Sequence, residues 1–193
     1  MPTTNTSSTP SPTPAPTLAT PQEILRFWYV EAGPEAWYKF NPDFDATIRQ
    51  RFSETYAAAA AGELFEWRRS PEGRLAEIIV LDQLSRNMFR DTPGAFASDP
   101  VALILAQEAV AQKLHLELGE RKSTLLMPYM HSESKRVHAV AIELFADTPS
   151  LDYERRHKEI IDRFGRYPHR NGILGRTSTA EELAFLETPG SSF

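Results

Sequence analysis

Arginine, lysine and histidine side chains are concentrated in one stretch of the sequence, from Arg155 to Arg176. This stretch has seven Arg or Lys residues and two acids, Glu159 and Asp162, so its formal charge is +5 in a chain whose total is −5. Guanidinium groups bind carboxylates and phosphates through paired hydrogen bonds. The stretch therefore predicts a place where an anion is bound, although it does not indicate a reaction.

The loop that follows Gly165 holds the strongest ligand-binding candidates in this stretch. Gly165 and Gly172 permit sharp turns at its ends, and Pro168 restricts the path between them. A rigid loop presents its side chains already aimed at a ligand, which lowers the entropy cost of binding. The alternative is structural, with the arginines capping helix carbonyls and pairing with acids. The candidates are Arg166, His169, Arg170 and Asn171.

The pattern around these arginines also occurs 80 residues earlier in the chain. Val80–Arg86 followed by Arg90 matches Ile160–Arg166 followed by Arg170. Both copies read apolar, apolar, Asp, any residue, apolar, small, Arg, and a second Arg four positions later. This internal repeat adds Arg86 and Arg90 to the predicted ligand-binding residues. Its two acids, Asp82 and Asp162, each precede an arginine by one helical turn, where a structural ion pair is expected.

Three residues could transfer protons, namely His131, Glu133 and His157. Glu133 lies at an expected helix start, where it would complement the helix dipole, but beside a histidine it could also activate water. His157 falls on the apolar face of its helix, so a buried structural histidine is the alternative to a catalytic one. These residues support a second hypothesis, a hydrolase of a phosphate or acyl ester that uses His and Glu for acid–base catalysis.

Composition and motifs exclude several other classes of function. The chain has no cysteine and its five histidines are scattered without His-x-x-x-His spacing, so no metal site is predicted. Neither a phosphate-binding loop nor a dinucleotide motif is present, and no cofactor is expected. The acidic isoelectric point, about 5.6, makes nucleic acid an unlikely partner. The longest apolar run, Val101–Ala106, is far shorter than a membrane span.

We therefore expect a cytoplasmic protein with no membrane association, whose partner is a small anionic ligand or a protein segment. The sequence does not indicate an oligomeric state.

Helix start and stop signals occur along most of the chain, and no segment shows the period-two alternation of a strand. We predict an all-α fold of antiparallel helical hairpins in a single domain, residues 20–193. Residues 1–19 are uncharged and rich in Pro, Ser and Thr, so a disordered tail is expected there. In the last helix, Glu181 is expected to complete a capping box with Ser178. The expected helices begin at Thr20, Asn41, Ser70, Asp99, Ser132, Ser150 and Ser178.

Several longer motifs resemble those of one known protein family. They are LDQLSRNMFR, MHSE, RFGRYPHRN, GRTSTAEELAFL and the terminal PGSSF. With them, the chain from about Ile24 to Phe193 resembles the family called domain of unknown function nine-two-four. The resemblance implies an all-helical fold similar to tetratricopeptide-repeat arrays and brings no assigned activity. The chain departs from the family pattern at Leu84-Ser85, where Phe-Pro is usual, and at His138, where glutamine is usual.

Overall fold

A computed structural model describes residues 18–37 and 39–192, and every regular element within these ranges is a helix. The predicted all-α class is confirmed. Most of the predicted disordered tail, residues 1–17, lies outside the described residues. Ala19 is described, and its backbone N–H donates a hydrogen bond of 2.9 Å to Oγ1 of Thr55. The end of the predicted tail is therefore attached to the helical body.

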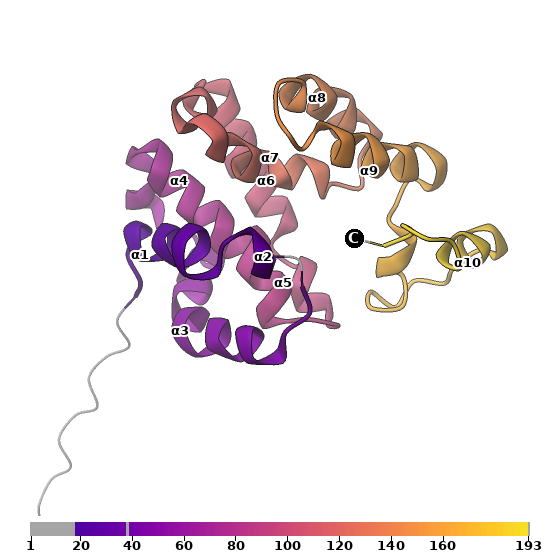
Figure 1. Ribbon diagram of the computed structural model, residues 1–193, viewed down its shortest axis with the longest axis horizontal. Helices are drawn as coiled ribbons and strands as arrows, with labels where there is room; N and C mark the ends of the chain where they lie inside the picture. Colours follow the sequence, from indigo (N-terminus) through magenta and orange to yellow (C-terminus); the bar gives the residue numbers. More distant parts are fainter. Residues whose placement is uncertain (1–17, 38, 193) are drawn as a thin grey trace, which may run out of the picture.

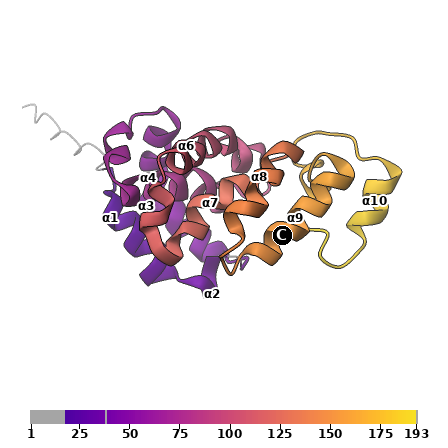
Figure 2. The same ribbon diagram turned by 90° about the horizontal axis from the view of Figure 1, so that it is seen from above.

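The N-terminal helices α1, α3 and α4 lie together at one end of the molecule, and α9 and α10 lie at the other (Figures 1 and 2). The α-helices are α1 (Pro21–Arg26), α2 (Pro34–Trp37), α3 (Pro42–Ala60), α4 (Pro71–Ile78), α5 (Ser85–Met88), α6 (Asp99–Ala111), α7 (Lys122–Met130), α8 (Lys135–Phe145), α9 (Leu151–Phe164) and α10 (Ala180–Leu186). Two π-helical segments are η1 (Phe27–Ala32) and η3 (Ile79–Leu84). The 3-10 helices are η2 (Phe65–Arg69), η4 (Pro93–Phe96), η5 (Leu114–Arg121) and η6 (Pro168–Arg170).

Consecutive helices contact each other, as expected of helical hairpins: α6 packs on α7, α7 on α8, and α8 on α9. Helices α1, α3, α4, α6 and α7 enclose the main core, in which the side chains of Trp28, Phe52, Leu81 and Phe145 are buried. Complete burial of such a side chain contributes roughly 1.5–3 kcal/mol. The likeness to tetratricopeptide arrays remains a prediction.

A second, smaller apolar cluster joins α9 and α10 to the loop between them. Ile160, Ile161 and Tyr167 are buried in it, and Phe164 and Phe185 pack against them. This cluster holds the segment after Gly165 against α9, and this segment carries the predicted ligand-binding loop. The position of that loop therefore depends on packing near the C-terminus.

The third expected helix is one continuous path through three elements, α4, η3 and α5. All six residues of η3 are buried, including Asp82 and Gln83. A π-helical turn holds more residues than an α-helical turn, so it changes the direction of the side chains that follow, and such turns are frequent at functional sites. The sequence pattern did not reveal this change of helical pitch.

Helix caps agree with the sequence in the N-terminal half and are shifted in the C-terminal half. The capping box of Thr20 and Glu23 and the caps of Asn41 and Ser70 form as predicted. The predicted cap Ser132 is wrong, because Ser134 caps α8. The carbonyl of Ser132 instead accepts a hydrogen bond from His138.

The predicted capping box of Ser178 and Glu181 is also wrong by one residue. Thr179 and Glu182 form the box at the start of α10. The Ser178 hydroxyl instead accepts a hydrogen bond of 3.0 Å from the Asn171 amide. Both shifts arise where several capping residues lie close together and tertiary contacts select among them.

Helix α7 was not predicted, and the fourth expected helix is shorter than predicted. Helix α6 ends at Ala111, and Lys113 then adopts a left-handed conformation with a φ of 61°. Helix α7 contains Pro128, whose missing N–H and fixed φ disfavour a helix interior. Tertiary packing of its buried face overrides this local preference.

Candidate functional site

A buried carboxylate and an imidazole form the centre of the candidate site. Asp82 lies in η3 with a fully buried side chain, and its Oδ1 is 2.8 Å from Nδ1 of His131, the residue that follows α7. Nε2 of Gln83 donates a hydrogen bond of 2.5 Å to Oδ2 of Asp82. Asp82 is thus hydrogen-bonded on both carboxylate oxygens.

Charges and hydrogen bonds set the ionisation of this pair. Burial acts to raise the pKa of Asp82, but His131, Arg86 and Gln83 together hold it below its usual value. Burial lowers the pKa of His131 despite the neighbouring carboxylate, so the imidazole is neutral at pH 7. A neutral imidazole beside a carboxylate places its proton on the nitrogen that faces the carboxylate. Nδ1 of His131 is therefore the donor.

Two arginines from the two copies of the internal repeat meet at one carboxylate, that of Asp99 at the start of α6. Nη1 of Arg86 is 3.1 Å from Oδ1 of Asp99, and its Nη2 donates a hydrogen bond of 3.1 Å to Oδ2. Nη1 of Arg170 donates to the same Oδ2 at 3.3 Å. Arg86 also donates to the backbone carbonyl of Asp82. The guanidinium groups of Arg86 and Arg170 therefore meet at one acid.

Arg170 is buried with most of its hydrogen-bonding capacity unused. Only 6% of the residue is exposed, and the bond to Asp99 is the one hydrogen bond that its side chain makes within the described residues. Its Nε is buried without a partner in that part of the chain. The guanidinium carbon lies 4.6 Å from the ring centre of Phe96 and 4.5 Å from that of Tyr167. The two rings fix the guanidinium plane.

A recess of about 340 Å³ opens beside these groups, between η4, the start of α6, the end of α7 and η6. Its apolar wall includes Phe96, Leu103 and Leu174. Its polar lining residues are Asp99, His131, Ser132, Glu133 and Arg170. The recess therefore combines an imidazole and a buried guanidinium with an apolar wall.

Glu133 lines the recess, but its carboxylate is engaged by other residues. It accepts hydrogen bonds of 2.5 and 2.9 Å from the Arg176 guanidinium and one of 2.8 Å from the backbone N–H of Tyr167. Burial acts to raise the pKa of Glu133, but the hydrogen bonds from Arg176 and the Tyr167 N–H outweigh burial and hold the pKa below its ordinary value. Glu133 fixes the loop after Gly165 in place.

His157 is buried on the inner face of α9, as expected if its role is structural and not catalytic. Its Nδ1 lies 2.8 Å from the backbone carbonyl of Tyr153, and its ring packs against Tyr167 at 5.8 Å. Burial lowers the pKa of His157 to about 3. It is not among the residues that line the recess.

Arg86 is not among the residues that line the recess, and the other two arginines predicted to bind ligand lie outside it as well, each held by an acid. Arg90 donates hydrogen bonds of 2.7 and 2.9 Å to Asp45 of α3. Arg166 donates bonds of 2.6 and 2.7 Å to Glu182 of α10. Each is thus a two-hydrogen-bond structural pair.

His169, Asn171 and Asp162 also lie outside the recess. The His169 ring packs 5.6 Å from that of Tyr167, and burial lowers the pKa of His169 to about 4. The side-chain amide of Asn171 donates a hydrogen bond to the Ser178 hydroxyl, as described above for the start of α10. The expected ion pair of Asp162 with Arg166 is absent, because Asp162 is exposed and pairs with Lys158 at 2.5 Å. Asp82, in contrast, lies 3.4 Å from Arg86, as predicted.

Several residues that position the site were missed from the sequence. His138 and Glu154 are both fully buried, with Nδ1 and Oε1 separated by 2.7 Å, and Nε2 of His138 donates to the Ser132 carbonyl at 2.8 Å. The Tyr167 hydroxyl donates to the Met130 carbonyl at 2.5 Å. These bonds hold the turn that carries His131 and Ser132. The departure from the family pattern at position 138 was the available signal.

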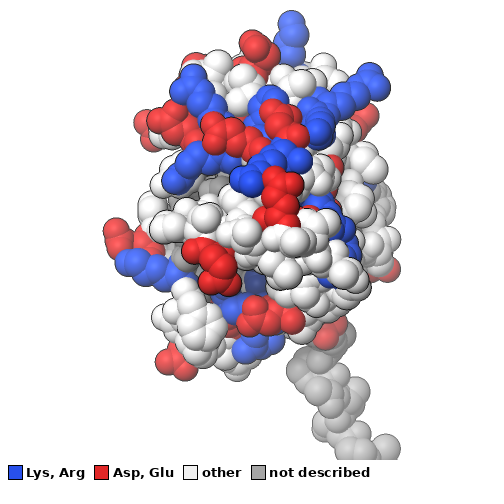
Figure 3. Space-filling view, turned by 90° about the vertical axis from the view of Figure 1, so that its right-hand side faces the viewer, with Lys and Arg blue, Asp and Glu red and all other residues white. Residues whose placement is uncertain are grey.

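The basic stretch does not form a positive surface. Figure 3, which views the α9 and α10 end of the molecule, shows basic and acidic side chains interspersed. Arg155 pairs with Asp152, Lys158 with Asp162, and Arg163 with Glu181. Acids close in space therefore neutralise a charge that is isolated in the sequence.

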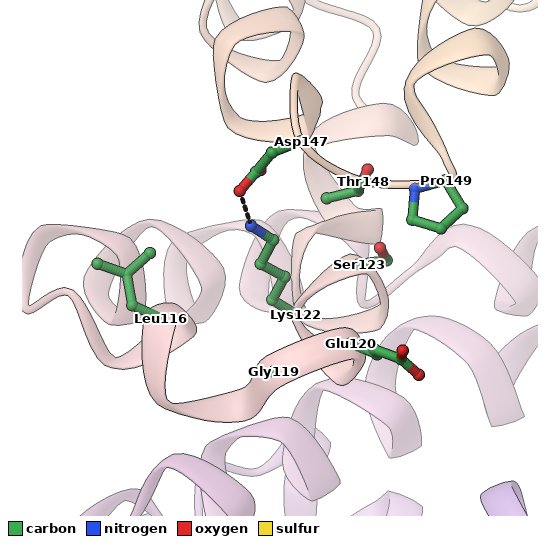
Figure 4. A pocket seen from close by; sticks show the side chains of 8 residues that line it. All are labelled: Leu116, Gly119, Glu120, Lys122, Ser123, Asp147, Thr148 and Pro149. Atoms are coloured by element: carbon green, nitrogen blue, oxygen red, sulfur yellow. Dashed lines mark hydrogen bonds and ion pairs between the residues drawn. The ribbon is translucent and has the colours of Figure 1, made fainter.

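A larger hollow of about 450 Å³ lies elsewhere, between η5, the start of α7 and the turn after α8. Figure 4 shows its main polar contact, a 2.6 Å ion pair between Lys122 and Asp147. None of the residues predicted for catalysis or binding lines it. Because none of those residues lines it and its lysine is paired with Asp147, this hollow is a weaker candidate than the recess.

Among residues 18–37 and 39–192, no group of three or more His, Cys, Asp or Glu side chains is arranged to hold a metal ion. Over the same ranges, no helix combines the length and apolar character needed to cross a membrane.

Residues 24–190 match a family described as bacterial protein of unknown function, DUF924, and the chain belongs to this family. The solved structure of a protein of unknown function from Agrobacterium tumefaciens is similar, with 35% sequence identity and a TM-score of 0.82. The match covers 86% of this chain and 96% of that one. No curated protein matches the chain. These descriptions assign no activity.

Proposed function

We propose that the recess binds the anionic group of a small molecule, with Arg170 as the principal contact and Arg86 supporting it through Asp99. The observation that carries this proposal is the state of Arg170: a buried guanidinium at a recess, making one hydrogen bond of 3.3 Å within the described residues. Burying a charged group without its hydrogen bonds destabilises a protein, and such a group in a recess is a candidate ligand contact.

The geometry of the recess favours a small organic ligand over a protein tail. Its volume of about 340 Å³ lies within the range of small-molecule pockets. The Phe96 and Tyr167 rings hold the Arg170 guanidinium in one plane, so little entropy is lost when an anion binds. The apolar wall would contact an apolar body attached to the anion.

The charges around the recess favour a ligand with one negative charge. With His131 neutral, three carboxylates balance three guanidiniums, so the carboxylates repel a dianion more strongly than a monoanion. A carboxylate is therefore the favoured anion, and a phosphate is the alternative. The balanced groups are Asp82, Asp99 and Glu133 with Arg86, Arg170 and Arg176.

Titration with benzoate, phenyl phosphate and neutral benzamide tests the proposal. Benzoate should raise the melting temperature and give saturable heat in calorimetry, because a ligand that binds the folded state stabilises it. Benzamide, which has the same ring and no charge, should not. Weaker binding of phenyl phosphate than of benzoate is expected, and the reverse order would identify phosphate as the preferred anion.

The variant Arg170→Lys retains the charge and removes the planar pair of donors. It should weaken benzoate binding about tenfold, since a hydrogen bond to a charged group is worth about 1.5–3 kcal/mol. Arg155→Lys is the matched control, because Arg155 is exposed and pairs with Asp152. Equal affinity in the wild type and Arg170→Lys, or no binding of either anion at millimolar concentration, would contradict the proposal.

A further inference from the structure

His131 presents one ring nitrogen to the recess while the other is fixed by a carboxylate. Nδ1 donates a hydrogen bond to the buried Asp82 carboxylate, and Nε2 has no hydrogen-bond partner within the described residues. The side chain is 12% exposed and lines the recess. A carboxylate that holds Nδ1–H orients the imidazole and leaves Nε2 as the basic nitrogen.

Both partners of this pair are held by neighbouring groups. Gln83 and Arg86 fix Asp82 from within its own helical path. The turn that carries His131 is fixed from the other side by the bonds from His138 and Tyr167 to its carbonyls. A base held this rigidly loses little entropy in reaching a reactive geometry.

We propose that the recess is an active site in which His131 acts as a general base for the hydrolysis of a small ester that carries a carboxylate. This inference rests on the proposed anion site, because Arg170 would bind that carboxylate. Nε2 of His131 takes a proton from a water molecule whose oxygen attacks the ester carbonyl. The tetrahedral intermediate expels the alkoxide, to which His131 returns the proton. The products are a carboxylic acid and an alcohol, and the imidazole is neutral again.

The charge distribution favours an acyl ester over a phosphate ester. Asp99 and Glu133 line the same recess, and each is paired with an arginine. A phosphoryl group would bring negative charge close to both carboxylates, whereas an ester carbonyl is neutral. Asp82 can stabilise the single positive charge that develops on His131.

Two substrates that differ only in a remote carboxylate test the inference. The wild-type protein should hydrolyse 4-acetoxybenzoate with a kcat/KM at least tenfold higher than that for phenyl acetate. His131→Gln should lower kcat by roughly 100-fold or more, the usual contribution of a general base. His115→Gln is the matched control, because His115 lies outside the recess. Arg170→Lys should raise KM for 4-acetoxybenzoate by a much larger factor than KM for phenyl acetate.

The pH profile supplies a second readout. Because burial lowers the pKa of His131, kcat should stay constant at neutral pH and decrease only below its ordinary value of 6.5. If the protein binds benzoate but does not hydrolyse 4-acetoxybenzoate above the buffer rate, catalysis is refuted and the anion site stands. Hydrolysis that is unchanged in His131→Gln also refutes the base. Hydrolysis that depends on His131 but not on Arg170 refutes the anion site instead.

Discussion

At the scale of single residues, Asp99 is a competitor for the groups that are proposed to bind ligand. Its carboxylate accepts from both Arg86 and Arg170, so an incoming anion must share or displace it. The hydrogen bond from Arg170 to Asp99 is long, at 3.3 Å, and therefore weak enough to be replaced by a bond to the ligand. The affinity of the recess for an anion therefore depends on how strongly Asp99 holds the two arginines.

Removing this internal competitor should strengthen anion binding. Asp99→Asn retains the shape of the side chain and leaves one net positive charge near the recess, so the dissociation constant for benzoate should fall roughly three- to tenfold. Calorimetry measures the change. Asp152→Asn is the control, since that acid is exposed and remote from the recess. Unchanged or weaker binding in Asp99→Asn would argue against direct contact between the ligand and the arginines.

Only part of the site could be predicted from single residues in the sequence. Arg86, Arg170 and His131 were found through the internal repeat and through residue type. Arg90 and Arg166 satisfy the same pattern, but their partners Asp45 and Glu182 come from other helices. Nothing near an arginine in the sequence distinguishes one that meets an acid in the fold from one that faces a recess.

At the scale of elements, the sequence predicted helix starts better than helix interiors. A cap depends on residues within one turn, so Thr20, Asn41 and Ser70 could be identified locally. The π-helical η3 and the proline-containing α7 depend on packing against the rest of the core. Asp82 lies in η3, and His131 directly follows α7. The geometry of the site could therefore not be predicted from local sequence patterns.

The two glycines predicted to flank the binding loop have different roles, and a pair of alanine variants separates them. Gly165 ends α9 with a φ of 69°, whereas Gly172 is not among the glycines with positive φ, and neither would meet a steric contact through an added Cβ. Gly165→Ala should lower the free energy of unfolding by about 1–2 kcal/mol, the cost of a left-handed conformation. Gly172→Ala should have little effect. Denaturant unfolding measures both, and equal losses would contradict this assignment.

At the scale of the whole molecule, four of the five histidines form one cluster around Tyr167. The rings of His138, His157 and His169 lie 5.6–6.4 Å from that of Tyr167, and His131 lies 6.5 Å from His157. The cluster joins α7, α8 and α9 to the C-terminal segment. Its protonation therefore bears on the integrity of the fold as a whole.

Stability should decrease as the pH falls from 6.5 toward 4.5. Burial lowers the pKa of His157 to about 3 and that of His169 to about 4, so in this interval the unfolded chain binds protons that the folded chain does not. Each histidine contributes a slope of up to about 1.4 kcal/mol per pH unit. Unfolding in urea at several pH values measures the slope, and His157→Gln should reduce it.

Protonation of the Glu182 carboxylate should lower the free energy of unfolding in a different pH interval. Arg166 lowers the pKa of Glu182 to about 2, so the stability from this pair is present above pH 4.5 and lost as the pH falls toward 2. The carboxylates that contact the cluster are Asp82, beside His131, and Glu154, beside His138, while Glu133, Arg86 and Arg170 lie near His169. Burial raises the pKa of Glu154, so this group opposes the slope from the histidines. A stability that is flat between pH 6.5 and 4.5 would show that the histidines are accessible to protons in the folded state.

The last segment of the chain completes the recess, since Arg170 and Leu174 line it and Arg176 secures Glu133 from the same side. The other walls come from residues 93–133 and are synthesised much earlier. Without this segment the recess would lack both Arg170 and the apolar wall of Leu174. Anion binding therefore reports that residues 165–176 have packed against the helices that precede them.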